Sequence, residues 1–137
     1  MHLIKLCVGI SSVDELIEWR AHRQSRGGDG RSIHRTRMMP RRADEIVGKG
    51  SIYWVIAGAV RCRQLIVGLE PDVDSEGRGY CDIVLDADII RTAPHPRRPF
   101  QGWRYLEPKD APADLAGEGE DLPPEGMAEE LAKYGLL

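Results

Sequence analysis

Two adjacent apolar segments, residues 51–57 and 59–69, constrain the fold of this chain more than any other feature. The first, Ser-Ile-Tyr-Trp-Val-Ile-Ala, is rich in the β-branched and aromatic side chains that favour strands. Gly58 follows it and predicts a bend or bulge, after which residues 59–69 continue as a second strand. The middle of the chain therefore predicts a β-sheet as the centre of the fold.

The flanking sequence alternates between further strands and short helices. Residues 12–15, Ser-Val-Asp-Glu, fit the capping box of a helix start, and the apolar stripe that follows predicts a helix over residues 13–24. Pro40 suits the first turn of a second, short helix, and Gly48 and Gly50 suit its end. The expected elements are strands at residues 3–8, 33–38, 51–57, 59–69, 80–85 and 100–106, and helices at residues 13–24, 41–47 and 125–134.

The connections between these elements are polar or rich in glycine and proline. Residues 26–31 predict a loop, residues 70–79 a hairpin-like connection, and residues 86–90 fit either a helical turn or a strand. Four prolines between residues 94 and 108 predict an extended path, apart from the strand at residues 100–106. Together the elements predict an α+β fold with a curled, mostly antiparallel sheet, short helices and a C-terminal helix.

Size and composition indicate one folded domain. A chain of 137 residues with 42% apolar and 30% charged residues is expected to fold as a single α+β domain over residues 1–117, followed by an acidic linker and terminal helix over residues 118–137. No run of about 18 apolar residues predicts a membrane span, and the first residues lack the pattern of a signal peptide. Three cysteines without paired spacing fit reduced thiols, so we expect a cytoplasmic protein.

The net charge of −3 conceals an uneven distribution of charge along the chain. Residues 1–106 carry 17 Lys and Arg against 13 Asp and Glu, whereas residues 107–137 carry 2 against 9. A basic body of this kind could bind a polyanion. The acidic tail could equally screen that body or dock a protein partner.

The arginines gather in two runs, residues 31–42 and 91–104, and both runs adjoin predicted strands. A guanidinium group holds phosphate through a planar fork of donors and stacks on bases, which a lysine does poorly. A folded core could present both runs on one cationic surface, or the arginines could be solvated and paired with nearby carboxylates. The predicted phosphate contacts are Arg35, Arg37, Arg41, Arg42, Arg97, Arg98 and Arg104.

An aromatic lip accompanies the second arginine run. Phe100 and Trp103 follow a proline-rich segment, where exposed aromatic rings could stack on bases, and Gln101 could hydrogen-bond a base edge. A tryptophan that anchors the loop onto the sheet fits the same pattern equally well.

Catalytic and metal-binding motifs are weak. The histidines and cysteines are scattered rather than paired, so no metal site or cofactor is expected. Cys81 and His95 could form a nucleophile and base, but no third member accompanies them. Residues 27–30, Gly-Gly-Asp-Gly, lack the context of a phosphate-binding loop. A carboxylate set for phosphoryl chemistry would draw on Asp82, Asp86 and Asp88.

Five blocks of the sequence resemble an uncharacterised alphaproteobacterial family, domain of unknown function 1489 (DUF1489). They are residues 2–9 (His-Leu-Ile-Lys-Leu-Cys-Val-Gly), 36–45 (Thr-Arg-Met-Met-Pro-Arg-Arg-Ala-Asp-Glu), 50–56 (Gly-Ser-Ile-Tyr-Trp-Val-Ile), 97–106 (Arg-Arg-Pro-Phe-Gln-Gly-Trp-Arg-Tyr-Leu) and 129–137 (Glu-Glu-Leu-Ala-Lys-Tyr-Gly-Leu-Leu). The resemblance covers nearly the whole chain. It implies an intracellular bacterial protein and supplies no activity.

The order of a short helix, a glycine-flanked turn, a strong strand and a curled sheet also looks like the pseudobarrel superfamily of PUA, ASCH and EVE domains. Those domains bind RNA or modified bases, which matches the arginines by fold-level analogy. The leading hypothesis is therefore an RNA- or nucleotide-binding module without assigned catalysis. The alternatives are a small hydrolase or transferase acting on a nucleotide or phosphorylated metabolite, and a protein-interaction module that uses the acidic tail.

Overall fold

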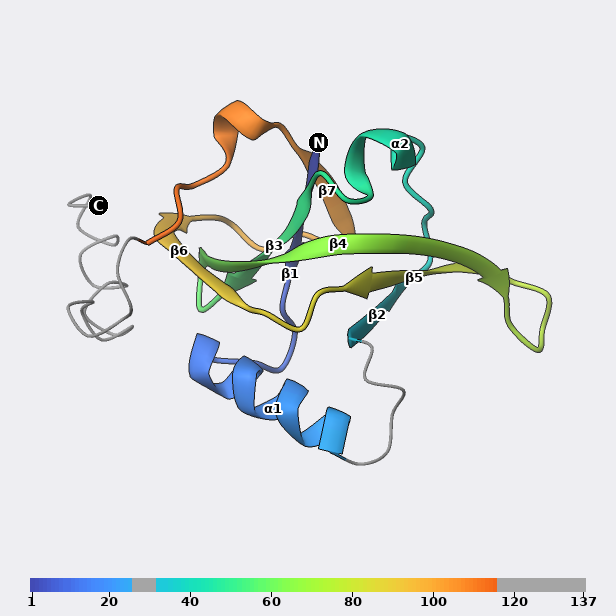
Figure 1. The fold of residues 1–137 in the computed structure, drawn as a ribbon, viewed down its shortest axis with the longest axis horizontal. Coiled ribbons are helices and arrows are strands. Elements are labelled where there is room, and N and C mark those ends of the chain that lie inside the picture. Colours follow the sequence, from blue (N-terminus) through green and yellow to red (C-terminus); the bar gives the residue numbers. More distant parts are fainter. Residues whose placement is uncertain (26–31, 116–137) are drawn as a thin grey trace.

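The computed structural model describes residues 1–25 and 32–115, in which seven strands form one curled, open sheet with few helices (Figure 1). This confirms the predicted α+β class. The predicted loop at residues 26–31 and the linker and helix predicted within residues 118–137 lie outside the described residues. The elements are β1 (His2–Leu6), α1 (Val13–Ser25), β2 (Ser32–Thr36), α2 (Ala43–Ile46), β3 (Ser51–Ile56), β4 (Ala59–Val73), β5 (Gly79–Leu85), β6 (Ile90–Pro96), β7 (Trp103–Leu106) and the 3₁₀ helix Pro108–Asp110.

The strand order is β2-β5-β4-β3-β1-β7, and β6 pairs with β4 beside this path. All pairings are antiparallel except that of β1 with β3, so the predicted mostly antiparallel sheet is confirmed. The first and last strands, β1 and β7, are direct neighbours. The chain thus returns at residue 106 to the strand with which it began.

Strand β4 is the longest element and organises the sheet. Its first half pairs with β3 on one side and β6 on the other, and its second half pairs with β5. Register shifts between Val60 and Cys62 and between Ile66 and Gly68 interrupt these ladders, and such irregularities increase strand bending and twist. The long, bent strand is visible across the centre of Figure 1.

Two sequence-based expectations about strands need correction. The connection predicted for residues 70–79 is shorter, because β4 continues to Val73 and pairs there with β5. Strand β6 spans Ile90–Pro96 and thus includes Pro94 and Pro96, where only an extended path was expected. Among the described strands β6 pairs only with β4, and an edge strand tolerates the missing N–H of proline.

The turn between β3 and β4 has two residues in the left-handed region. Ala57 has φ 50° and Gly58 has φ 81°, and Ile56 pairs directly with Ala59. Two-residue hairpin turns with positive φ match the twist of the flanking strands. The predicted bend at Gly58 is therefore a tight hairpin turn.

Strand β3 is buried along its whole length, because apolar clusters cover both of its faces. Trp54 belongs to the larger cluster inside the curl, with Leu16 of α1 and Ile83 of β5. Tyr53 belongs to a smaller cluster on the other face, with Leu106 of β7. Both aromatic residues are almost fully buried.

The two helices begin and end near the predicted positions. The Glu15 N–H donates to Ser12 Oγ at 3.0 Å, which is one half of the predicted capping box, while the Glu15 carboxylate accepts from Ser11 Oγ at 2.9 Å. Helix α2 starts at Ala43, two residues later than predicted, and Gly48 follows its end with φ 74°. Within residues 1–25 and 32–115, neither helix has the length and apolar character that a membrane crossing requires.

Candidate functional site

The fold brings the two arginine-containing segments into contact. The Trp103 indole N–H donates to the Met38 carbonyl at 2.8 Å. The Tyr105 hydroxyl accepts hydrogen bonds from the backbone N–H groups of Arg41 at 2.9 Å and Arg42 at 3.3 Å. Strand β7 therefore holds the segment between β2 and α2.

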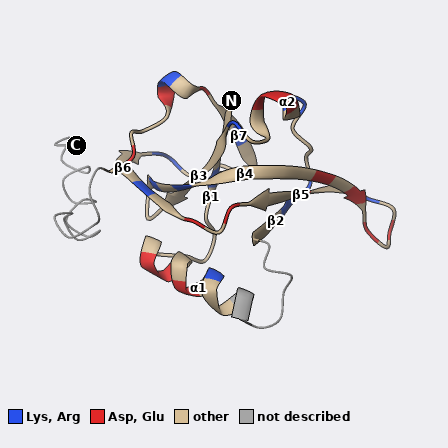
Figure 2. Cartoon of the chain, viewed as in Figure 1, with Lys and Arg blue, Asp and Glu red and all other residues tan. Residues whose placement is uncertain are grey.

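Three of the seven predicted arginines are occupied by carboxylates. Arg35 makes a bidentate pair with Asp82, at 2.7 and 3.1 Å, and lies over the Tyr80 ring. Arg37 pairs with Asp74 at 2.9 Å, and Arg42 pairs with Glu45 through two hydrogen bonds of 2.7 Å. Figure 2 shows acidic residues close to basic ones around the β4–β5 hairpin. Because their donors are engaged by carboxylates, these arginines are poorly suited to hold phosphate.

The other four predicted arginines differ in this respect. Within the described part of the chain, no hydrogen bond or ion pair engages the guanidinium groups of Arg41, Arg97, Arg98 and Arg104. Arg97 and Arg104 both stack on Phe100, with their central carbons 5.4 and 5.3 Å from the ring centroid. We call Arg97, Arg98, Arg104 and Phe100 the Phe100 cluster.

The backbone fixes the position of the Phe100 cluster. The Arg97 N–H donates to the Gly58 carbonyl of the β3–β4 turn at 2.9 Å. Phe100 packs on the smaller apolar cluster, and Arg104 lies on β7 opposite Ile4 of β1. These backbone and packing contacts position the cluster's cationic side chains, whereas Arg41 is held through its backbone N–H by the Tyr105 hydroxyl.

The residues of the predicted aromatic lip differ in their exposure and contacts. Gln101 is exposed on the turn before β7, where Gly102 has φ 68°. Trp103 is half-buried, packs against the larger apolar cluster and meets Tyr105 edge to face at 4.9 Å. The structure thus shows the loop-anchoring contact of Trp103, while its stacking on a base stays a prediction.

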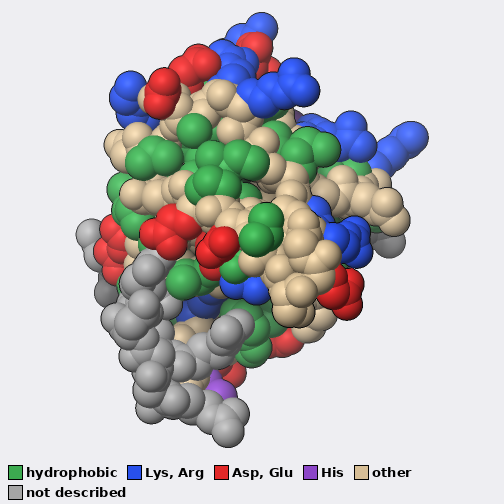
Figure 3. All heavy atoms as spheres, turned by 90° about the vertical axis from the view of Figure 1, so that its right-hand side faces the viewer, with side chains coloured by type: hydrophobic (Ala, Val, Ile, Leu, Met, Phe, Trp, Pro, Cys, Tyr) green, Lys and Arg blue, Asp and Glu red, His purple; other side chains and the backbone are tan. Residues whose placement is uncertain are grey.

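Figure 3 shows one outer face, where hydrophobic side chains lie between Lys and Arg side chains at its margins.

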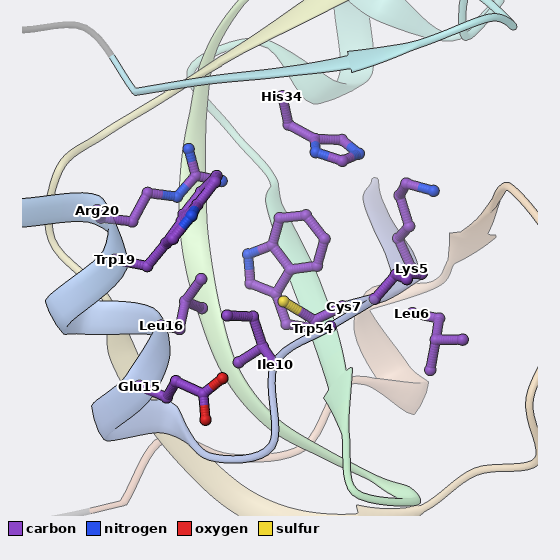
Figure 4. A pocket seen from close by; sticks show the side chains of 12 residues that line it. Lys5, Leu6, Cys7, Ile10, Glu15, Leu16, Trp19, Arg20, His34 and Trp54 are labelled. Atoms are coloured by element: carbon purple, nitrogen blue, oxygen red, sulfur yellow. The ribbon is translucent and has the colours of Figure 1, made fainter. Parts of the chain in front are cut away.

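A pocket of about 440 Å³ opens between α1, β1, β2 and β3 (Figure 4). Its polar and titratable lining comes from Lys5, Cys7, Glu15, Arg20 and His34, and its aromatic residues are Trp19 and Trp54. Sequence reasoning missed this site. The one available signal was the alternation of polar Lys5 and Cys7 with apolar neighbours in the first strand.

Burial controls the protonation of the pocket. Together with the smaller effect of the nearby cations Lys5 and Arg20, it lowers the pKa of His34 to about 4. Burial also raises the pKa of Cys7 to about 11. At neutral pH the pocket therefore contains an uncharged imidazole and an uncharged thiol, and Cys7 is unsuited to nucleophilic catalysis.

The weaker catalytic hypotheses find little support in the geometry. Cys81 and His95 pair with Pro71 and Val60, which are far apart along β4, and burial raises the pKa of Cys81. Asp82 is paired with Arg35 outside the pocket, and Asp86 accepts the Asp88 backbone N–H. No group of three potential metal ligands occurs in residues 1–25 and 32–115.

These features define a curled-sheet α+β protein with an arginine-bearing cluster at one edge and a polar pocket between α1 and the sheet. The chain belongs to the DUF1489 family of proteins of unknown function, whose model matches residues 3–137. The resemblance seen in the sequence is thereby confirmed. No curated protein and no solved structure matches the chain.

Proposed function

We propose that this protein is an RNA-binding module whose Phe100 cluster contacts the phosphate backbone. The observation that carries the proposal is the pair of guanidinium groups, Arg97 and Arg104, stacked on one ring without a carboxylate partner in the described chain. Such groups keep their hydrogen-bond donors available to phosphate oxygens. Arg98, exposed and next in sequence to Arg97, adds a third cation.

The contrast within the protein supports this choice of residues. Arg35, Arg37 and Arg42 have the same chemistry but are neutralised by Asp82, Asp74 and Glu45. A phosphate would have to displace a carboxylate at each of those positions, whereas at the Phe100 cluster it would displace only water. The proposed surface therefore keeps three of the seven sequence-predicted contacts, Arg97, Arg98 and Arg104.

A PUA-like pseudobarrel architecture is part of the same proposal. It is supported by the curl of the sheet and by the short helix α2, which leads through Gly48 and Gly50 directly into β3. A cytoplasmic location also belongs to the proposal. It is supported by the three cysteines, which are all free thiols.

The test is a fluorescence anisotropy titration with labelled single- and double-stranded RNA and DNA at two salt concentrations. We expect RNA affinity to fall as salt rises. The double variant Arg97→Ala/Arg104→Ala should bind RNA roughly tenfold or more weakly, with a shallower dependence on salt.

The control is the charge-matched double variant Arg35→Ala/Arg37→Ala. It removes the same two formal charges but only arginines that are already paired. The proposal requires the control to retain most of the affinity for RNA. An equal loss in both variants, or no loss in Arg97→Ala/Arg104→Ala, would contradict it.

A further inference from the structure

The pocket is built from side chains that strand pairing directs to the same face. Lys5 is the Cα partner of Trp54 in the parallel β1–β3 pair and of Trp103 in the β1–β7 pair. Figure 4 shows His34 above Trp54, with Trp19 and Arg20 on one side and Lys5 on the other. Three strands and a helix therefore enclose one space.

Aromatic rings line the pocket at its base and side. Trp54 lies at the base and is almost fully buried, and its indole N–H is used by Gln64 Oε1 at 3.0 Å. His34 stands edge-on to Trp54, with ring centroids 5.1 Å apart. Trp19, 42% exposed, stands at the side and can adjust to a ligand. An aromatic ring that enters here meets stacking surface and excludes water.

Two polar groups of the pocket have unused hydrogen-bonding capacity. His34 Nε2 is buried and has no hydrogen-bond partner within the described chain, a state that costs free energy unless a ligand or water satisfies it. The half-buried Lys5 ammonium has neither a hydrogen bond nor an ion pair with any described residue. A ligand that fits this pocket would therefore bring a hydrogen-bonding group to His34 and an anion to Lys5.

We infer that this pocket binds one nucleotide, with its base against Trp19, its base edge at His34 and its phosphate at Lys5. The inference rests on the proposed function and adds a second, separate contact to it. The volume of about 440 Å³ falls in the range of small-ligand sites, about 300–1,000 Å³. The neutral imidazole can donate to or accept from a base edge, as its tautomer requires.

Glu15 determines how the nucleotide is oriented in the pocket. It lies in the first turn of α1, away from Lys5 in Figure 4, and one oxygen of its carboxylate accepts from Ser11 Oγ at 2.9 Å. It repels a phosphate on its own side and accepts a hydrogen bond from an exocyclic amino group. The pocket should therefore prefer adenine or cytosine nucleotides over uridine nucleotides.

The nucleotide in the pocket can come from either of two sources. A free nucleotide can enter the pocket, or one residue of an RNA strand can enter it while neighbouring phosphates contact the Phe100 cluster. In the second arrangement the strand passes around the β7 edge, because Lys5 lies opposite Trp103 while Arg104, the next residue of β7, faces the other side of the sheet. Competition between the two ligands distinguishes the sources.

The experiment is isothermal titration calorimetry of the full chain with adenosine 5′-monophosphate, adenosine, ribose 5-phosphate and uridine 5′-monophosphate. We expect one site for adenosine monophosphate, with adenosine and ribose 5-phosphate each roughly tenfold weaker or worse, because each lacks one anchor. Lys5→Met should reduce adenosine monophosphate to the affinity of adenosine and leave adenosine itself unchanged. Trp19→Ala and His34→Phe should weaken both ligands.

Arg37→Ala serves as the control, since Arg37 is paired with Asp74 at the β4–β5 hairpin and should not affect nucleotide binding. Absence of binding at millimolar adenosine monophosphate, or binding that Lys5→Met, Trp19→Ala and His34→Phe all leave unchanged, overturns the inference. RNA binding by the Phe100 cluster would survive either result.

Competition then separates the sources of the nucleotide. If adenosine monophosphate displaces a labelled adenine oligonucleotide and Lys5→Met weakens that oligonucleotide, the pocket holds a nucleotide of a strand. If the oligonucleotide is unaffected by both, the pocket holds a free nucleotide. Conversely, nucleotide binding without any RNA binding would refute the proposed function alone.

Discussion

The indole N–H of Trp103 is bonded to the carbonyl oxygen of Met38, 65 residues away in sequence. This hydrogen bond joins β7 to the segment between β2 and α2. It couples the two arginine-containing segments mechanically, although no arginine side chain takes part. The contact therefore acts on the shape of the surface rather than on its charge.

Replacing Trp103 by Phe tests that coupling. Phenylalanine retains most of the apolar packing but removes the donor, so we expect a loss of about 1 kcal/mol in the free energy of unfolding. Hydrogen exchange should accelerate at the backbone amides of Arg41 and Arg42, which Tyr105 otherwise holds. Unchanged exchange at these amides would show that the Trp103 contact does not order the segment.

Protonation of His34 should destabilise the fold in mild acid. Burial and the cations Lys5 and Arg20 lower the pKa of His34 from 6.5 to about 4. The unfolded chain therefore takes up this proton first as the pH falls, so the stabilisation is complete above pH 6.5 and is lost towards pH 4. From pH 7 to pH 5 the loss attributable to His34 is about 2 kcal/mol.

Urea unfolding at pH 7, 6 and 5 checks the His34 prediction. His34→Phe should remove a large part of the dependence on pH in this interval, because carboxylates titrate mainly at lower pH. The part that remains is expected from His2, whose pKa burial also lowers. An identical pH dependence in the variant and the natural protein would assign the effect to other groups.

Ala57 should be replaceable with a gain in stability. It has φ 50° beside Gly58 in the β3–β4 turn, a position that asparagine adopts more easily than alanine. Ala57→Asn should raise the free energy of unfolding by about 1 kcal/mol. Thermal unfolding measures the gain, and Ala87→Asn, at an exposed bend without positive φ, should change stability little.

Gly50 should tolerate no side chain. A Cβ atom there would lie 1.9 Å from the Met1 carbonyl oxygen, which is backbone and cannot rotate away. Gly50→Ala must displace the N-terminus and lose the Ser51 N–H to His2 Nδ1 bond of 2.9 Å. We expect a loss of about 2 kcal/mol in chemical denaturation. Gly79→Ala, whose nearest contact would be 3.9 Å, should be far milder and provides the comparison.

The local elements could be predicted because each has a local cause. The helix cap at Ser12 and the run of branched and aromatic residues at Ser51–Ile56 act within a few residues of sequence. Strand β6 was missed because Pro94 and Pro96 argue against a strand, and only its place at an edge makes them acceptable.

The candidate sites were less predictable because they depend on strand register. Arg35 is neutralised because the β2–β5 pairing places it opposite Asp82, a partner 47 residues away. The pocket exists because β1 pairs in parallel with β3, which sets Lys5 beside Trp54. Neither register leaves a trace in local composition, so the sequence could indicate which arginines are present but not which remain unpaired.

The place of β1 between β3 and β7 governs the order of assembly. Strand β7 has no docking edge until β1 has inserted beside β3, and Leu106 meets His2 only at the end of that process. Contacts of such long sequence separation slow folding. During synthesis, therefore, strand β1 can pair with β7 only after residues 103–106 have left the ribosome.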